Sequence, residues 1–174
     1  MAGENKTGVH PGDKPFVITR VLDAPRDLVW RVYTEEKHLM QWWGPKGFKM
    51  LKCTMDLRPG GIFHYGMQAP DGSTMWGKWT IREIVKPERL SVVVAFSDEK
   101  GGITQHPFSP NWPRKTLAIS DFTESGGKTT VTLAWYALNA TEIERETFDA
   151  GHESMKMGFA GTFEQLTDYL KTTQ

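Results

Sequence analysis

Residues 141–171, TEIERETFDAGHESMKMGFAGTFEQLTDYLK, form the stretch that decides the expected fold. Apolar and aromatic residues recur in it at steps of three and four, the spacing that gathers side chains on one face of a helix. Thr141 and Glu144 form a capping-box pattern, which marks a helix start. We therefore predict one long amphipathic helix, whose buried face comprises Phe148, His152, Met155, Phe159, Phe163, Leu166 and Leu170.

A second row on this helix consists of small residues, on the flank of the apolar face. Each glycine inside a helix costs about 1 kcal/mol relative to alanine, so the row needs a structural reason. Close approach of a neighbouring strand or helix is one explanation, and room for a bound ligand is the other. The row comprises Gly151, Ser154, Gly158 and Gly161.

Length and composition indicate a single domain. We expect a flexible leader over residues 1–14 and one domain over residues 15–174. The 21 basic residues balance the 21 acidic ones, so no net charge favours nucleic acid or an anionic membrane. The single cysteine excludes an internal disulfide, and neither a secretion signal nor an apolar run of about 20 residues is present. We therefore expect a cytoplasmic protein with no nucleic-acid partner and no membrane insertion.

The chain before residue 141 is typical of an antiparallel sheet. Residues 16–22 alternate as a first strand, and Pro25 suits the first turn of a helix. Thr34 is the expected cap of a second short helix, which reaches Met40. Short turns with Gly and Pro then separate further strands, which must be antiparallel because parallel neighbours need long crossovers. These strands are expected at residues 50–57, 62–68, 74–85, 90–96, 115–122 and 129–138.

Aromatic side chains gather on one parity of the predicted strands. A curved sheet that presents these rings to the terminal helix would enclose a large apolar volume, either a solid core or a ligand cavity. The long connection at residues 97–114 is either a binding loop or simple packing. The sets that share a face are Phe63, Tyr65 and Met67; Gly77 and Trp79; and Val131, Leu133 and Trp135.

In this order of elements the chain resembles the helix-grip fold of START-type lipid-transfer domains, the major birch-pollen allergen and polyketide cyclases (the SRPBCC superfamily). Over residues 16–170 it more closely resembles homologues of the C-terminal domain of the Hsp90 ATPase activator. The run Phe148-Asp149-Ala150-Gly151-His152 resembles a bacterial single-domain branch of these homologues. The motifs are Trp42-Trp43-Gly44-Pro45, Pro59-Gly60-Gly61, Gly77-Lys78-Trp79, Glu83-Ile84, Pro87-Glu88-Arg89-Leu90 and Phe148-Asp149-Ala150-Gly151-His152.

The resemblance implies an α+β helix-grip fold: a curved antiparallel sheet wrapped around a long C-terminal helix, with two short helices after the first strand. It also implies a single-domain protein whose relatives bind hydrophobic small molecules, a few of them acting on polyketides. Many relatives carry Gly-Trp where this chain has Gly158-Phe159. Only the short leader precedes the resembling region, so we do not expect Hsp90 activation to carry over.

The chain offers few candidates for catalysis. Its five histidines show no metal-ligand spacing, and its paired glycines lie between strands, so we expect no metal and no cofactor. Cys53 lies in an apolar strand and is expected to be a small buried hydrophobe. His152 is the candidate general acid or base, and its alternative is a hydrogen-bonded core histidine. His106 and Glu83 are weaker candidates for the same role.

We predict a small hydrophobic or aromatic ligand in an internal cavity as the function. One alternative is a cyclase- or aromatase-like enzyme that uses the same cavity, and another is a protein-interaction module akin to the Hsp90 co-chaperone domain. A homodimer is compatible with exposed sheet edges. The predicted ligand-binding residues are Trp42, Tyr65, Trp79, His106, Trp112, Trp135, His152, Met155 and Phe159.

Overall fold

A seven-stranded antiparallel sheet is the frame of the computed structural model, which describes residues 6–174. The strands lie in the order β1-β7-β6-β5-β4-β3-β2, so the chain's first two strands form the two edges. The predicted α+β helix-grip fold is confirmed. In chain order the elements are β1 (Phe16–Leu22), α1 (Arg26–Thr34), α2 (Glu36–Trp42), β2 (Lys49–Met55), β3 (Ile62–Gln68), β4 (Thr74–Val85), β5 (Arg89–Ser97), β6 (Thr116–Ser125), β7 (Lys128–Ala137), α3 (Glu142–Ala150) and α4 (His152–Thr172).

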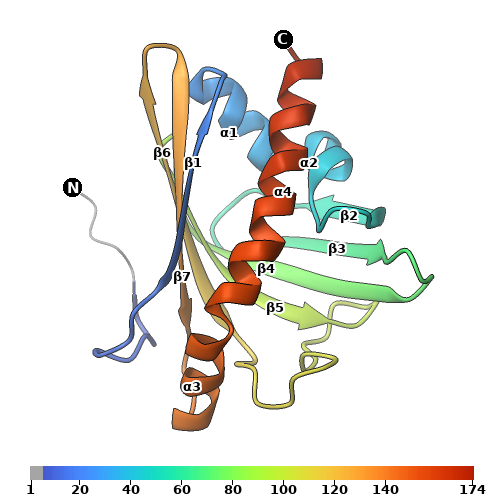
Figure 1. Ribbon diagram of the computed structural model, residues 1–174, viewed down its shortest axis with the longest axis vertical. Coiled ribbons are helices and arrows are strands. Elements are labelled where there is room, and N and C mark those ends of the chain that lie inside the picture. Colours follow the sequence, from blue (N-terminus) through green and yellow to red (C-terminus); the bar gives the residue numbers. More distant parts are fainter. Residues whose placement is uncertain (1–5) are drawn as a thin grey trace.

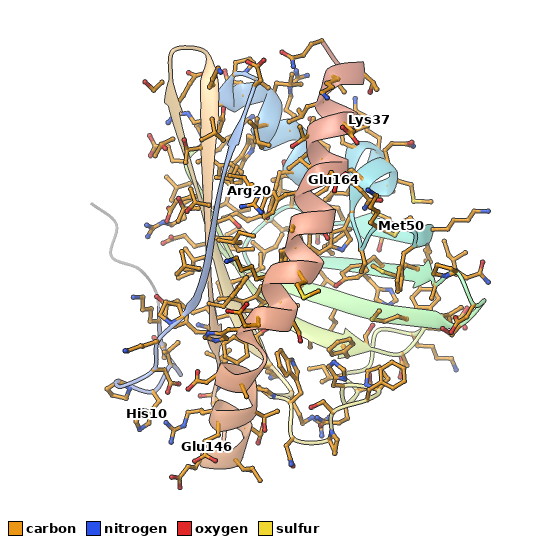
Figure 2. The ribbon with its side chains drawn as sticks, in the orientation of Figure 1. His10, Arg20, Lys37, Met50, Glu146 and Glu164 are labelled. Atoms are coloured by element: carbon orange, nitrogen blue, oxygen red, sulfur yellow. The ribbon has the colours of Figure 1, made fainter. Side chains whose placement is uncertain are left out.

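Helix α4 crosses one face of the curved sheet (Figure 1). Helices α1 and α2 lie near the C-terminal half of α4, whereas α3 and the loop between β5 and β6 lie at the opposite end. Figure 2 labels Glu164 on α4 at the level of α2, and its carboxylate pairs with Lys46 Nζ at 2.9 Å. The core therefore lies between α4 and the concave face of the sheet. None of the described helices combines the length and apolarity that crossing a membrane requires.

The terminal segment is two helices, so the prediction of one continuous helix is wrong in this respect. Helices α3 and α4 meet at Gly151, which has φ −88° and ψ −2°. The predicted capping box is confirmed, because Thr141 Oγ1 accepts from the Glu144 N–H and the Glu144 side chain reaches back to the Thr141 N–H. Phe163 is fully buried, as is the rest of the C-terminal half of the apolar face, whereas Phe159 is only half-buried.

The two short helices differ from expectation at their boundaries. Pro25 is the N-cap of α1 instead of lying in its first turn. Thr34 does not cap α2 but ends α1, where its hydroxyl donates to the Trp30 carbonyl at 2.7 Å. This intrahelical bond satisfies the hydroxyl and leaves Glu35 as the N-cap of α2. Helix α2 continues two residues beyond the predicted end, to Trp42.

Two glycine–aromatic pairs shape the β3–β4 hairpin. Tyr65 lies opposite Gly77, and Trp76 lies opposite Gly66. A Cβ atom on Gly77 would come within 2.5 Å of the Tyr65 hydroxyl oxygen. Glycine therefore lets the tyrosine ring lie over the neighbouring strand, and this contact fixes the position of its hydroxyl.

Residues 6–14 lie against the face of the sheet opposite α4. The Gly8 carbonyl accepts from the Asn139 N–H at 2.8 Å, and Val9 packs on a small outer cluster that includes Leu117. Asp13 Oδ1 pairs with Arg145 Nη1 at 3.2 Å, which links the segment to α3. Residues 1–5 of the predicted leader lie outside the described residues.

Candidate ligand-binding site

A cavity of about 560 Å³ lies between α4 and the sheet. Its walls come from strands β3 to β7, the segment after α2, the loop between β5 and β6, and the small-residue flank of α3 and α4. Pockets for small molecules fall in the range of roughly 300–1,000 Å³, so the space suits a ligand of several rings. The aromatic residues of the wall are Trp43, Tyr65, Trp76, Phe96, His106, Trp112, Trp135 and Phe159.

The cavity wall carries no formal charge. No Lys, Arg, Asp or Glu is among the described residues that line it. Burial raises the pKa of Tyr65 to about 12 and lowers the pKa of His106 below its usual value. Both groups are therefore neutral at pH 7, and the site stabilises neither an anion nor a cation by charge pairing.

The Tyr65 hydroxyl is a polar group of the inner wall. Tyr65 is 9% exposed, and its hydroxyl makes no hydrogen bond of good geometry with the described residues. The Trp43 ring lies edge-on to the Tyr65 ring, with centroids 5.9 Å apart. Trp43 Nε1 is buried without a hydrogen-bond partner, although it lies near enough to the hydroxyl to offset part of the rise in the Tyr65 pKa. An unpaired donor thus lies beside an unpaired hydroxyl.

Two other polar side chains of the wall, Trp135 and Thr162, are already paired within the protein. Trp135 Nε1 donates to Thr116 Oγ1 at 2.6 Å, and the Thr116 hydroxyl lies 3.4 Å from the Val94 carbonyl. Thr162 Oγ1 donates to the Gly44 carbonyl at 3.1 Å. These bonds hold the walls in place and leave few polar groups to a ligand.

The loop between β5 and β6 forms one end of the cavity through ring contacts. The His106 ring lies 4.8 Å from Phe96 and 5.7 Å from Trp112, and Trp112 lies 5.3 Å from Phe148 of α3. His106 Nδ1 accepts from the Phe108 N–H at 3.0 Å, so a neutral His106 carries its proton on Nε2. The loop is therefore a packed wall of the cavity.

The small-residue row shows close approach at one position and open space at another, while its role in ligand binding stays a prediction. A Cβ atom on Gly151 would come within 2.7 Å of Trp112 Cζ3, so the Gly151 backbone lies too close to the indole for a side chain. A Cβ atom on Gly158 would meet nothing within 4 Å, and Gly158 lines the cavity. A Cβ atom on Gly161 would make an ordinary van der Waals contact with Lys46, whose Cβ would lie 3.4 Å away.

Comparison with known proteins adds to this geometry. The family model for Activator of Hsp90 ATPase homolog 1-like protein matches residues 23–171. The chain belongs to this family. No curated protein matches the chain.

Solved structures of bacterial proteins share the family's fold. A crystal structure from Mycobacterium smegmatis is 27% identical and has a TM-score of 0.70, with 88% of each chain covered. A crystal structure from Nitrosomonas europaea is 26% identical with a TM-score of 0.72, covering 94% of this chain and 98% of the other. An AHSA1 protein from Silicibacter pomeroyi is 13% identical with a TM-score of 0.68, covering 92% and 100%, and shows likeness of fold alone.

In this member of the Hsp90 activator homologue family, the cavity brings together six of the nine predicted ligand-binding residues. Trp42 and Trp79 do not line the cavity but lie in the core. Adjacent indoles cannot face the same way: Trp42 points inward and donates to the Val32 carbonyl at 2.9 Å, whereas Trp43 faces the cavity. Ligand binding by the six remains a prediction. They are Tyr65, His106, Trp112, Trp135, Met155 and Phe159.

His152 lies outside the cavity as well. Its ring sits between Phe16 and Phe148, at 5.8 and 5.1 Å, and its Nε2 is buried without a hydrogen bond. The nearest carboxylate oxygen, from Asp149, is 3.8 Å away. His152 is thus not among the residues that line the cavity, and its Nε2 lacks the hydrogen bond expected of a core histidine.

The other candidates for chemistry lie away from the cavity in this family member. Glu83 lies on β4 and does not belong to the wall. Cys53 is buried, and desolvation raises the pKa of its thiol to about 12. Among residues 6–174, no group of three or more His, Cys, Asp or Glu side chains is arranged to hold a metal ion.

Sequence reasoning missed several wall residues of this family member. Met67 shares its strand face with Tyr65, so the parity argument could have found it. Phe96 could have been found in the same way on β5. Trp76 has the opposite parity to Trp79, so the parity argument does not find it; it lies near the start of β4 and lines the cavity.

Proposed function

We propose that this protein binds an apolar, ring-containing small molecule in the cavity between α4 and the sheet. The observation that carries the proposal is a space of about 560 Å³ with aromatic residues on every wall and no charged side chain. Transfer of a ring system from water into such a space is favourable, at roughly 25 cal/mol per Å² of apolar surface buried. Edge-to-face contacts with the surrounding rings add to this gain.

Binding without turnover fits the wall better than catalysis does. General acid–base chemistry needs a titratable group within hydrogen-bond reach of the substrate, often with a second group that orients it. The titratable side chains among the described wall residues are Tyr65 and His106, and both are held neutral by burial. His152, the candidate catalytic residue, lies outside the wall.

The test is a fluorescence titration with N-phenyl-1-naphthylamine, an uncharged probe whose emission rises in apolar surroundings. Gly158→Phe places a ring where the structure has open space, and Val94→Phe fills the cavity from the sheet side. We expect each substitution to weaken probe binding more than tenfold, because each ring takes up ligand volume.

Met157→Phe is the matched control. Met157 precedes Gly158 on α4, is 77% exposed and does not line the cavity, so the same ring at this position points to solvent. We expect this variant to bind the probe as the unmodified protein does. Equal binding by all variants, with the folded state verified by circular dichroism, would contradict the proposal.

A further inference from the structure

We propose that the cavity selects an uncharged ring system that carries a carbonyl or ether oxygen, and that this oxygen accepts a hydrogen bond from Tyr65. The inference rests on the proposed function and names the chemical class of its ligand. Three features of the site carry it: a wall without charge, the unpaired Tyr65 hydroxyl on the inner wall, and an unpaired indole N–H beside that hydroxyl.

The uncharged wall excludes ionised ligands. A carboxylate or ammonium that enters the cavity loses its hydration, and the described wall residues include no Lys, Arg, Asp or Glu to replace it. Burial of an uncompensated charge is far more costly than burial of the same ring system without it. The ligand is therefore neutral in its bound form.

Tyr65 provides the polar contact that fixes the ligand's orientation. The residue is nine-tenths buried, its ring packs 4.9 Å from Phe63, and Gly77 leaves the space that its hydroxyl occupies. The hydroxyl has no partner of good geometry among the described residues. An acceptor on a ligand in the cavity can pair with this hydroxyl, and the new bond adds to the gain from burying the ring system.

Tyr65 acts as a donor toward the ligand. The Trp43 and Tyr65 rings lie edge-on with centroids 5.9 Å apart, and the Trp43 N–H is buried without a partner; because an indole N–H can only donate, Trp43 offers the Tyr65 oxygen a donor and no acceptor. The remaining capacity of the hydroxyl is its own O–H. The complementary ligand atom is a hydrogen-bond acceptor, and a carbonyl or ether oxygen is the acceptor that a neutral ring system most commonly carries.

The experiment measures displacement of N-phenyl-1-naphthylamine by three molecules with closely similar ring systems: fluorene, 9-fluorenone and fluorene-9-carboxylate. We expect fluorenone to bind about three- to tenfold more tightly than fluorene, the ratio that one net hydrogen bond supplies. We expect the carboxylate to bind more than tenfold more weakly than fluorene. The first ratio tests whether the cavity favours a ligand with an acceptor oxygen, and the second tests whether it favours a neutral ligand.

Tyr65→Phe removes only the hydroxyl and tests its role. The variant should lose the advantage of fluorenone over fluorene while its affinity for fluorene stays the same, which also shows that the cavity is intact. Tyr33→Phe is the matched control, because Tyr33 is equally buried and its hydroxyl lies 3.5 Å from Ser120 Oγ, away from the large cavity. This control should keep the full advantage of fluorenone.

Three results would overturn the inference: equal binding of fluorene and fluorenone, an advantage of fluorenone that survives Tyr65→Phe, or a carboxylate that competes as well as fluorene. The proposed function would survive each of them as long as Gly158→Phe still blocks the probe. Failure of the probe and of all three molecules to bind would instead remove the proposed function itself.

Discussion

The backbone of Gly151 lies directly against the indole of Trp112, so that a Cβ atom at position 151 would be 2.7 Å from Trp112 Cζ3. This contact joins the loop between β5 and β6 to the junction of α3 and α4. Trp112 also packs on Phe148, and both Trp112 and Gly151 line the cavity. The end wall of the cavity therefore depends on one residue having no side chain.

Alanine at Gly151 and alanine at Gly158 should have opposite effects on stability. Gly151→Ala should destabilise the protein by about 1–3 kcal/mol, because Trp112 must move. Gly158→Ala should stabilise it by up to about 1 kcal/mol, because the added methyl group meets nothing within 4 Å and alanine favours the helix. Urea unfolding of both variants measures the difference. Equal changes at the two positions would show that the contact with Trp112 is not tight.

Tyr65 should make the protein less stable in alkaline solution. Burial raises the Tyr65 pKa from 10.0 to about 12, so the fold favours the neutral phenol. The contribution of the neutral phenol to the free energy of unfolding is fully present below pH 10. It declines as the pH rises toward 12, by about 1 kcal/mol at pH 11. Tyr65→Phe should remove that part of the decline in the free energy of unfolding between pH 8 and pH 11, which urea unfolding measures. A decline as steep as in the unmodified protein would show that Tyr65 titrates normally.

The thiol of Cys53 should be inert in the folded protein. It is buried on β2, 3.7 Å from the Glu36 carbonyl, and desolvation raises its pKa to about 12. At pH 8 the reactive thiolate is therefore scarce, and access to it is blocked. Mass spectrometry should find no alkylation by iodoacetamide under native conditions and complete alkylation in urea. Rapid labelling of the native protein would contradict the buried placement of Cys53.

The hydrogen bond between Trp135 and Thr116 should contribute measurably to stability. Thr116→Val removes the acceptor and leaves the Trp135 N–H unpaired at the cavity wall, a change that should cost about 1–3 kcal/mol. Thr116→Ser keeps the hydroxyl and serves as the control. In a Trp135→Phe background the N–H is absent, so Thr116→Val should cost much less. If Thr116→Val destabilised the Trp135→Phe variant as much as the unmodified protein, the loss of stability would come from packing and not from the hydrogen bond.

Periodicity and turn chemistry in the sequence predicted most of the fold. Strands β1, β3 and β4 occupy the predicted residues, because alternation with flanking Gly and Pro is a strong local signal. The capping box at Thr141 was predicted for the same reason, since its two partners lie three positions apart. Local patterns failed at the break at Gly151, whose backbone packs against Trp112, nearly forty residues earlier in the chain.

The sequence by itself determined the elements, their antiparallel order and the apolar faces, since these follow from the spacing of side chains along the chain. Only the tertiary structure decided which rings face the cavity, that Trp43 faces it while Trp42 points away, and that His152 lies outside it. It also decided that Tyr65 lies on the cavity wall beside Trp43, whose indole N–H is buried without a partner. The physical reason is that a cavity is the space left between packed elements, and its shape depends on contacts between residues far apart in the sequence.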